Sequence, residues 1–414
     1  MNVQQPNSIA IRCRTARRWL HQLRFKWKNV KKGVFIDGHE RADVVSYRQN
    51  TFIPKFEKLR PLLVWWDAEG NMQVPDIPEG ERPHVLITHD ESTFNANDGK
   101  RFLWVEENKQ PLRPKGRGKG IMVSDFLTAG GQLQVPMTIP DEHFEQEQIP
   151  QRFASEYLEY GKDNYWTGEK MVSQTIKVAL PIFRAAFPGF IGVWAFDNAS
   201  NHCVFHENAL RVDRLNKGPG GKQPIMREGF IHGKGRPQSM QYPDNYHRLE
   251  LAGKPKGVKQ ILLERGEWDR EYYLECPKTL GRPGCLPEGR CCGRAILAVE
   301  RDFREQKGLL QEELESRGQK VIFYPKFHCE LNPIEPYWCK AKWFTRENCD
   351  YTLNGLRSAI PSALASVHSS SINGFFQRSL RTIDAYKDGV RYGTEDFKSR
   401  VYKSHRRFED RSKW

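Results

Sequence analysis

Short apolar runs separated by polar turns begin at His84 and predict most of a central sheet. The runs at 84–90, 120–127 and 190–197 are nearly unbroken, which is typical of strands covered on both faces. Further strands are predicted at 102–106, 132–139 and 319–324, and helices at 37–60, 167–187, 302–317 and 332–346, with two more within 353–386. This order predicts an α/β protein whose mixed sheet is flanked by helices.

The pattern divides the 414 residues into three parts. Residues 1–83 are predicted to form a basic helical segment, a partial helix-turn-helix remnant followed by a linker rich in proline and acidic residues. Residues 84–350 carry the sheet and contain an insertion rich in glycine, proline and lysine, which we place at 216–300. Residues 351–414 are expected to form a helical extension with a basic tail.

Basic residues are concentrated at the two ends of the chain. The net charge is +14, and residues 1–60 and 377–414 carry +10 and +5, so the body between them is close to neutral. Such arms suit DNA, because neutralised phosphates release condensed counterions, although a solvated basic surface is the alternative. The candidate DNA contacts are Arg14, Arg17 and Arg18 in an amphipathic helix, and Arg113, Lys115, Arg117 and Lys119 in a compact loop.

The lengths of the apolar runs and the cysteine usage disfavour a membrane protein and a secreted disulfide scaffold. No apolar run approaches the roughly 20 residues that span a bilayer, and no secretory signal is expected. The nine cysteines lack the even spacing of a secreted disulfide framework, which favours a reducing compartment. Four of them cluster in the insertion and are candidate zinc ligands, with four reduced thiols as the alternative: Cys276, Cys285, Cys291 and Cys292.

Three acidic residues stand at positions where an α/β sheet brings side chains together. Asp90 and Asp197 each follow a buried strand run, and Glu335 opens a predicted helix. Three convergent carboxylates suit two hard divalent cations, which can activate a water for phosphodiester displacement. Each acid also has a structural explanation: the aspartates can start turns, and Glu335 can complete a capping box with Asn332.

The segments around these acids resemble the three conserved blocks of mariner-like DDE transposases. The matching segments are Asp90-Glu91-Ser92, the run from Asp197-Asn198 to His202, and Glu330-Leu331-Asn332-Pro333-Ile334-Glu335. The resemblance implies a ribonuclease-H-like catalytic domain, Mg²⁺ or Mn²⁺, and cut-and-paste transposition. It also implies that Asp90, Asp197 and Glu335 are the catalytic metal ligands. His202 is a candidate contact to substrate phosphate, or else a cap of the next helix.

The expected function is therefore a DNA endonuclease and strand transferase acting on transposon ends and target DNA, in the nucleus and as a homodimer like related enzymes. The long separation of Asp197 from Glu335 in the sequence requires the predicted insertion, and residues 1–83 are shorter than the family's paired DNA-binding modules. Two alternatives remain open: an inactive or domesticated DNA-binding descendant, and a nuclease acting on RNA or hybrid duplexes.

Overall fold

The computed structural model describes residues 12–23, 38–100, 112, 114–146, 148–160, 165–198, 204–276 and 290–402. Contacts divide the chain into two compact units, Met1–Gly38 and His39–Trp414. The first unit contains helix α1 (Cys13–Gln22), on which Arg14, Arg17 and Arg18 are at least partly exposed. Within the described residues, no helix is both long and apolar enough to cross a bilayer. The strand predicted at 102–106 and the candidates Arg113, His202 and Cys285 lie outside the described residues.

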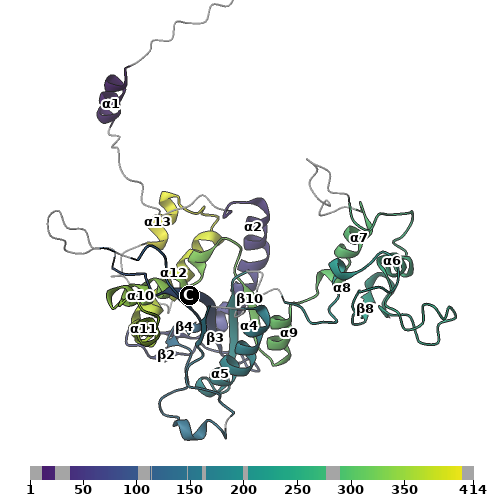
Figure 1. Cartoon of the computed structure of the whole chain (residues 1–414), viewed down its shortest axis with the longest axis horizontal. Coiled ribbons are helices and arrows are strands. Elements are labelled where there is room, and N and C mark those ends of the chain that lie inside the picture. The colour runs from purple at the N-terminus through teal and green to yellow at the C-terminus, as the bar shows by residue number, and fades with distance from the viewer. Residues whose placement is uncertain are drawn as a thin grey trace, which may run out of the picture. The chain divides into compact units, whose positions relative to one another are not determined.

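The second unit is built on a six-stranded mixed sheet (Figure 1). Its strands run in the order β10 (Lys320–Phe323), β7 (Ile191–Phe196), β3 (His84–Asn95), β4 (Gly120–Thr128) and β5 (Gly131–Gln132), and β6 (Glu156–Glu159) also pairs with β4. The first three strands are parallel, whereas β4 is antiparallel to β3. This is the ribonuclease-H-like strand order, so the predicted fold class is confirmed.

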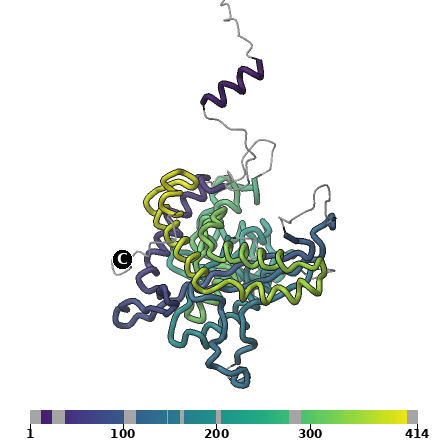
Figure 2. The backbone as a smooth tube through the Cα atoms, turned by 90° about the vertical axis from the view of Figure 1, so that its left-hand side faces the viewer, coloured from purple at the N-terminus to yellow at the C-terminus, as the bar shows by residue number. Residues whose placement is uncertain are grey.

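Side chains of each central strand alternate between two helical layers. One face packs Ile87, Trp194 and Val321 against α4 (Gly168–Gln174), α5 (Leu180–Ala186) and α9 (Leu309–Ser316). The opposite face packs against α10 (Ile334–Glu347), α11 (Leu353–Ala365) and α12 (Ser369–Lys387), and against α3 (Ile53–Leu59) and α13 (Glu395–Val401). Figure 2 shows these C-terminal helices in yellow and green. We call this second face the α10 face.

The helices predicted at 37–60 and 167–187 are each interrupted by a π-helical turn. The first comprises α2 (Ala42–Tyr47), the π turn η1 (Arg48–Phe52) and α3, and the second comprises α4, the π turn η4 (Thr175–Ala179) and α5. Within the predicted linker, a small hairpin pairs β1 (Trp65–Trp66) with β2 (Met72–Gln73). Short 3-10 turns lie at Arg60–Leu62, Asp141–His143, Val212–Arg214, His232–Lys234 and Cys329–Leu331.

Three predicted elements are wrong in extent. The helix predicted at 302–317 is two helices, α8 (Arg301–Arg304) and α9, because Gly308 adopts an extended conformation between them. The strand predicted at 132–139 ends at Gln132, with an isolated bridge at Gln134. The strand predicted to end at Asp90 continues to Asn95, because its antiparallel pairing with β4 extends beyond its parallel pairing with β7.

The insertion between β7 and α9 has a core of its own. It contains β8 (Gly229–Ile231), β9 (Arg236–Gln238), α6 (Val258–Arg265), α7 (Gly293–Val299) and α8. Its buried residues include Val258, Ile261, Leu262, Ile296 and Leu297. The fully buried Arg265 side chain donates to both carboxylate oxygens of Asp302, at 2.9 and 2.7 Å, and to Glu300 at 2.7 Å. A buried ion-pair network therefore ties α6 to α8.

Candidate active site

The register between β3 and β7 sets Asp90 and Asp197 at the same level of the sheet. The last parallel pair joins Thr88 to Ala195, and each aspartate lies two residues beyond its member of that pair. Ala195 packs on the α10 face, and the period of two in a strand gives Asp197 the same side. Asp90 also points to the α10 face, since it accepts a hydrogen bond from that helix.

The N-terminal part of α10 lies against Asp90. Trp338 Nε1 donates to Asp90 Oδ2 at 3.2 Å. Glu335 precedes Trp338 by three residues, which places both side chains on neighbouring positions of one helix face. In the part of the chain that the structure describes, we find no hydrogen-bond donor to the Glu335 carboxylate, so this side chain is not engaged in a cap.

Asn332 joins the start of α10 to β3 and replaces the predicted capping box. Its backbone amide donates to Cys329 O at 3.0 Å, so Glu335 does not bond back to it. Its side chain accepts from Thr88 Oγ1 at 2.5 Å and donates to His89 O at 3.3 Å. Because these partners directly precede Asp90, the Asn332 amide fixes the helix start beside that carboxylate. The sequence indicated Asn332 only as a helix cap.

We expect Asn332→Ala to lower the free energy of unfolding by about 1–3 kcal/mol, because it removes hydrogen bonds to Thr88 and to the His89 carbonyl in a buried region. Urea unfolding followed by circular dichroism measures this change. Asn348→Ala is the matched control, because Asn348 is an exposed residue at the other end of α10. An equal loss in both variants would contradict the role assigned to Asn332.

The three acids interact electrostatically. Burial and the charges of Glu335, Glu91 and Asp197 raise the pKa of Asp90 well above its ordinary value. Burial raises the pKa of Glu335 as well; the charge of Lys342 opposes this shift, and the charge of Asp197 adds to it. Their ionised forms therefore repel one another at neutral pH, which is the electrostatic state that a bound divalent cation relieves.

The pKa of Asp90, which burial and neighbouring charges raise, predicts a pH-dependent stability in the absence of metal. A carboxyl group whose pKa is raised by folding destabilises the folded protein above that pKa, and the cost disappears as the pH falls towards the ordinary carboxyl range. In EDTA, Asp90→Asn should therefore raise the melting temperature at pH 8, and the gain should shrink as the pH is lowered towards 4. Thermal unfolding of both proteins across this range tests it. A gain that grows on acidification would contradict the expectation.

Asp125 and Glu91 lie near Asp90, but each accepts hydrogen bonds from neighbouring residues of the fold. Asp125 lies opposite Asp90 on β4 and is fully buried, and its carboxylate accepts from Gln132, Ser155 and Tyr337 and from the Phe126 amide. Glu91 accepts from Trp166 Nε1 at 2.5 Å, and Trp166 packs on the α4 and α5 side of the sheet. Strand alternation thus directs Glu91 away from Asp90, as the sequence predicts.

His328 lies in the loop before α10 and is packed against side chains from other segments of the chain. Arg48 Nη1 lies 2.9 Å from its Nε2, Tyr386 and His39 stack on its ring, and burial lowers its pKa to about 4. Ligand atoms of His39, His328 and Glu330 lie within 4.8 Å of one another. Since Arg48 can only donate, His328 Nε2 accepts and Nδ1 carries the proton. That protonation state leaves Nδ1 no lone pair for a metal.

The other predicted ligands and contacts lie elsewhere. Lys115, Arg117 and Lys119 are exposed in the loop before β4, where Gly118 has φ +72° and leaves room for the Asn97 side chain. Sulfur atoms of Cys276, Cys291 and Cys292 lie within 4.8 Å of one another. By contrast, the carboxylate oxygens of Asp90, Asp197 and Glu335, all within the described part of the chain, do not form a set that lies within 4.8 Å of one another. Their role as metal ligands stays a prediction.

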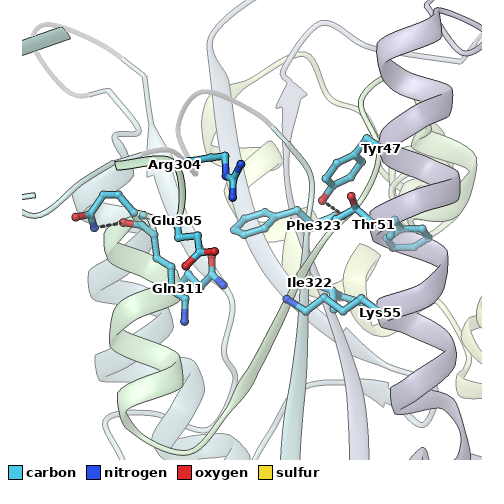
Figure 3. A pocket seen from close by; sticks show the side chains of 12 residues that line it. Tyr47, Thr51, Lys55, Arg304, Glu305, Gln311, Ile322 and Phe323 are labelled. Atoms are coloured by element: carbon cyan, nitrogen blue, oxygen red, sulfur yellow. Dashed lines mark hydrogen bonds between the residues drawn. The ribbon is translucent and has the colours of Figure 1, made fainter. Parts of the chain in front are cut away.

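A cavity of about 530 Å³ lies at the β10 edge of the sheet (Figure 3). Tyr47, Thr51 and Lys55 line one side of it, and Arg304 and Gln311 the other. Tyr47 donates its hydroxyl to Phe323 O at 3.0 Å across the wall of the cavity. None of the three acids lines this cavity, so it is separate from the candidate active site.

No protein-family model matches the chain, and no curated protein sequence matches it. Among solved structures, it is similar to the Mos1 transposase paired-end complex with left transposon end, at 10% identity and a TM-score of 0.44, over 91% of this chain and 70% of that chain. The Mos1 Strand Transfer Complex is 10% identical with a TM-score of 0.44, over 92% of this chain and 71% of that chain. A pre-cleavage Mos1 transpososome is 9% identical with a TM-score of 0.43, over 95% of this chain and 83% of that chain. At these identities and TM-scores the likeness assigns neither a family nor a residue role to this chain.

Proposed function

We propose that the chain is a metal-dependent DNA endonuclease and strand transferase of a cut-and-paste transposon. The observation that carries the proposal is the register of β3 and β7, which sets Asp90 and Asp197 level on one face, with Glu335 on the helix pinned beside them. The resemblance of the same three segments to mariner-like transposases supports this choice among enzymes that hold paired divalent ions.

Asp90, Asp197 and Glu335 are the residues that would hold Mg²⁺ or Mn²⁺. The donor set fits these ions, because it consists of carboxylate oxygens, and burial together with neighbouring negative charge raises the pKa values of Asp90 and Glu335. Two such ions can activate a water and stabilise the leaving oxygen of an in-line phosphodiester displacement. Trp338 would orient Asp90 through its hydrogen bond, and Asn332 would hold Glu335 in position.

The reaction has two steps with the same geometry. In the first, water attacks a phosphodiester at the transposon end, which releases a DNA strand with a 3′-hydroxyl. In the second, that hydroxyl attacks a target phosphodiester, so one bond forms as another breaks. Neither step needs a covalent link to the protein, and we assign no serine or tyrosine nucleophile.

DNA as substrate follows from the resemblance and from the basic ends of the chain. Arg14, Arg17 and Arg18 on α1, and the exposed Lys115, Arg117 and Lys119 before β4, would contact phosphates. Contacts of this kind strengthen association in low salt and weaken it as salt rises. We further propose that the protein acts in the nucleus as a homodimer.

The function is tested by incubating the full chain with supercoiled plasmid and with repeat-ended linear DNA. Nicking or cleavage that requires Mg²⁺ or Mn²⁺, and that stops in EDTA, is expected. Salt-sensitive binding with no cleavage under any metal condition would overturn the enzymatic proposal and favour a DNA-binding descendant. Preferential cleavage of an RNA–DNA hybrid would instead favour the nuclease alternative.

A further inference from the structure

We propose that Cys276, Cys291 and Cys292 bind a structural Zn²⁺ ion in the insertion, outside the candidate active site. The ligand sulfur atoms of these three residues all lie within 4.8 Å of one another. Thiolates bound to one tetrahedral zinc ion lie about 3.8 Å apart, as follows from a Zn–S distance of about 2.3 Å. The three side chains therefore need only a small contraction to surround an ion.

Backbone pairing brings these cysteines together from two separate segments of the insertion. Gly293 N donates to Tyr273 O at 2.9 Å, and Arg294 N donates to Leu274 O at 3.0 Å. Arg294 Nη1 also donates to Glu275 Oε2 at 2.8 Å. The segment ending at Cys276 is thus aligned with the start of α7, and Cys291 and Cys292 directly precede that helix.

The insertion core holds one of the three thiols in a fixed place. Cys292 is fully buried, and the following Gly293 is so close to the core that an added Cβ would lie 3.0 Å from Val258 Cγ1 and 3.2 Å from Trp268 Cζ3. A side chain at this position would therefore require Val258 and Trp268 to shift by a few tenths of an ångström. Cys276 is partly buried and Cys291 is exposed, so an ion has a path from solvent.

The chemistry of the set favours zinc over the divalent ions of the candidate active site. Sulfur ligands select zinc in structural sites, whereas Mg²⁺ and Mn²⁺ prefer carboxylate oxygens. A disulfide would use only two of the three sulfurs. The fourth position of a tetrahedral site remains for a water or for another ligand from the chain.

A structural reason for the metal is the small size of the insertion core. Its buried cluster is smaller than each of the three clusters that pack around the central sheet, and small cores commonly gain stability from a metal or a disulfide. Zinc would clamp the segment ending at Cys276 to α7, and α7 contributes Ile296 and Leu297 to that cluster. Removal of zinc should therefore loosen the insertion and not the central sheet.

The experiment measures zinc in the full chain purified under reducing conditions without added metal. We expect about one zinc per chain by mass spectrometry of the metal, falling to near zero in Cys276→Ser and in Cys292→Ser. Cys13→Ser, at an exposed cysteine of α1, is the matched control and should keep the ion. Cobalt substitution should produce the intense near-ultraviolet absorption of thiolate-to-cobalt charge transfer.

If a variant fails to fold, measurements on the wild-type protein still test the proposal. After chelation, titration should restore one zinc per chain and protect the three thiols from alkylation. The proposal is overturned if the wild type neither contains nor takes up stoichiometric zinc, if both serine variants retain it, or if peptide mapping without added reductant finds Cys276 in a disulfide. None of these measurements depends on DNA cleavage, so the proposed enzymatic function can fail separately.

Discussion

Asp197→Asn is expected to lower the rate of metal-dependent DNA cleavage by about 10³-fold or more, with Asp90→Asn and Glu335→Gln giving losses of the same order. Stabilisation of transition-state charge by bound divalent ions amounts to several kcal/mol, and each 1.4 kcal/mol corresponds to about a tenfold change in rate. The substitutions preserve the size of each side chain, and the asparagine at position 90 can still accept from Trp338. Single-turnover cleavage with excess enzyme measures the effect.

The Asp90→Asn variant should lose activity without losing thermal stability, and this combination distinguishes a catalytic role from a structural one. Asp90→Asn removes a repulsive charge and should melt at a higher temperature than the wild type in EDTA at neutral pH. Added Mg²⁺ should raise the melting temperature of the wild type more than that of the variant.

Glu91→Gln is the matched control for these variants, because Glu91 faces the other side of the sheet and is bonded to Trp166. It should keep most of the cleavage activity. If Glu91→Gln is as inactive as Asp197→Asn, or if Asp197→Asn cleaves as fast as the wild type, the assignment of the three acids is wrong.

Asp302→Ala is expected to destabilise the insertion by about 3–5 kcal/mol, because it leaves the buried Arg265 guanidinium without its bidentate partner. Burial alone would raise the pKa of Asp302, but hydrogen bonds from Arg265 and from the Phe230 amide lower it, so the carboxylate is charged in the folded state. Native-state hydrogen exchange of the amides in α6 and α8 measures the free energy of local opening.

The neighbouring exposed ion pair supplies the comparison. Arg301 and Glu305 pair at 2.9 Å with side chains that are 59% and 54% exposed, so Glu305→Ala should cost less than about 1 kcal/mol. Replacing Arg265 and Asp302 together by apolar residues of similar size should recover much of the stability lost in Asp302→Ala. If Glu305→Ala and Asp302→Ala have equal effects, the buried network does not hold the insertion together.

Much of the fold could be predicted from local patterns, because the period of apolar residues depends only on whether a segment is a strand or a helix. The strands β4, β7 and β10 and the helix α10 lie close to where the sequence predicts them, and β3 begins at the predicted residue but continues beyond its predicted end to Asn95. Breaks were harder to predict. An extended Gly308 divides α8 from α9, and π turns interrupt two other helices. The apolar period does not reveal such breaks, because it continues through them.

By itself, the sequence determined which chemistry-bearing residues the protein has: three acids next to apolar runs, a cysteine cluster and basic ends. Only the tertiary structure decided how they are combined. Asp90 and Asp197 lie at the same level of the sheet because β3 and β7, which are distant in the sequence, pair in a particular register. The hydrogen bond between Thr88 and Asn332 likewise joins distant segments. Hydrogen-bond register and side-chain contacts over such separations arise from the packed core, and no local pattern encodes them.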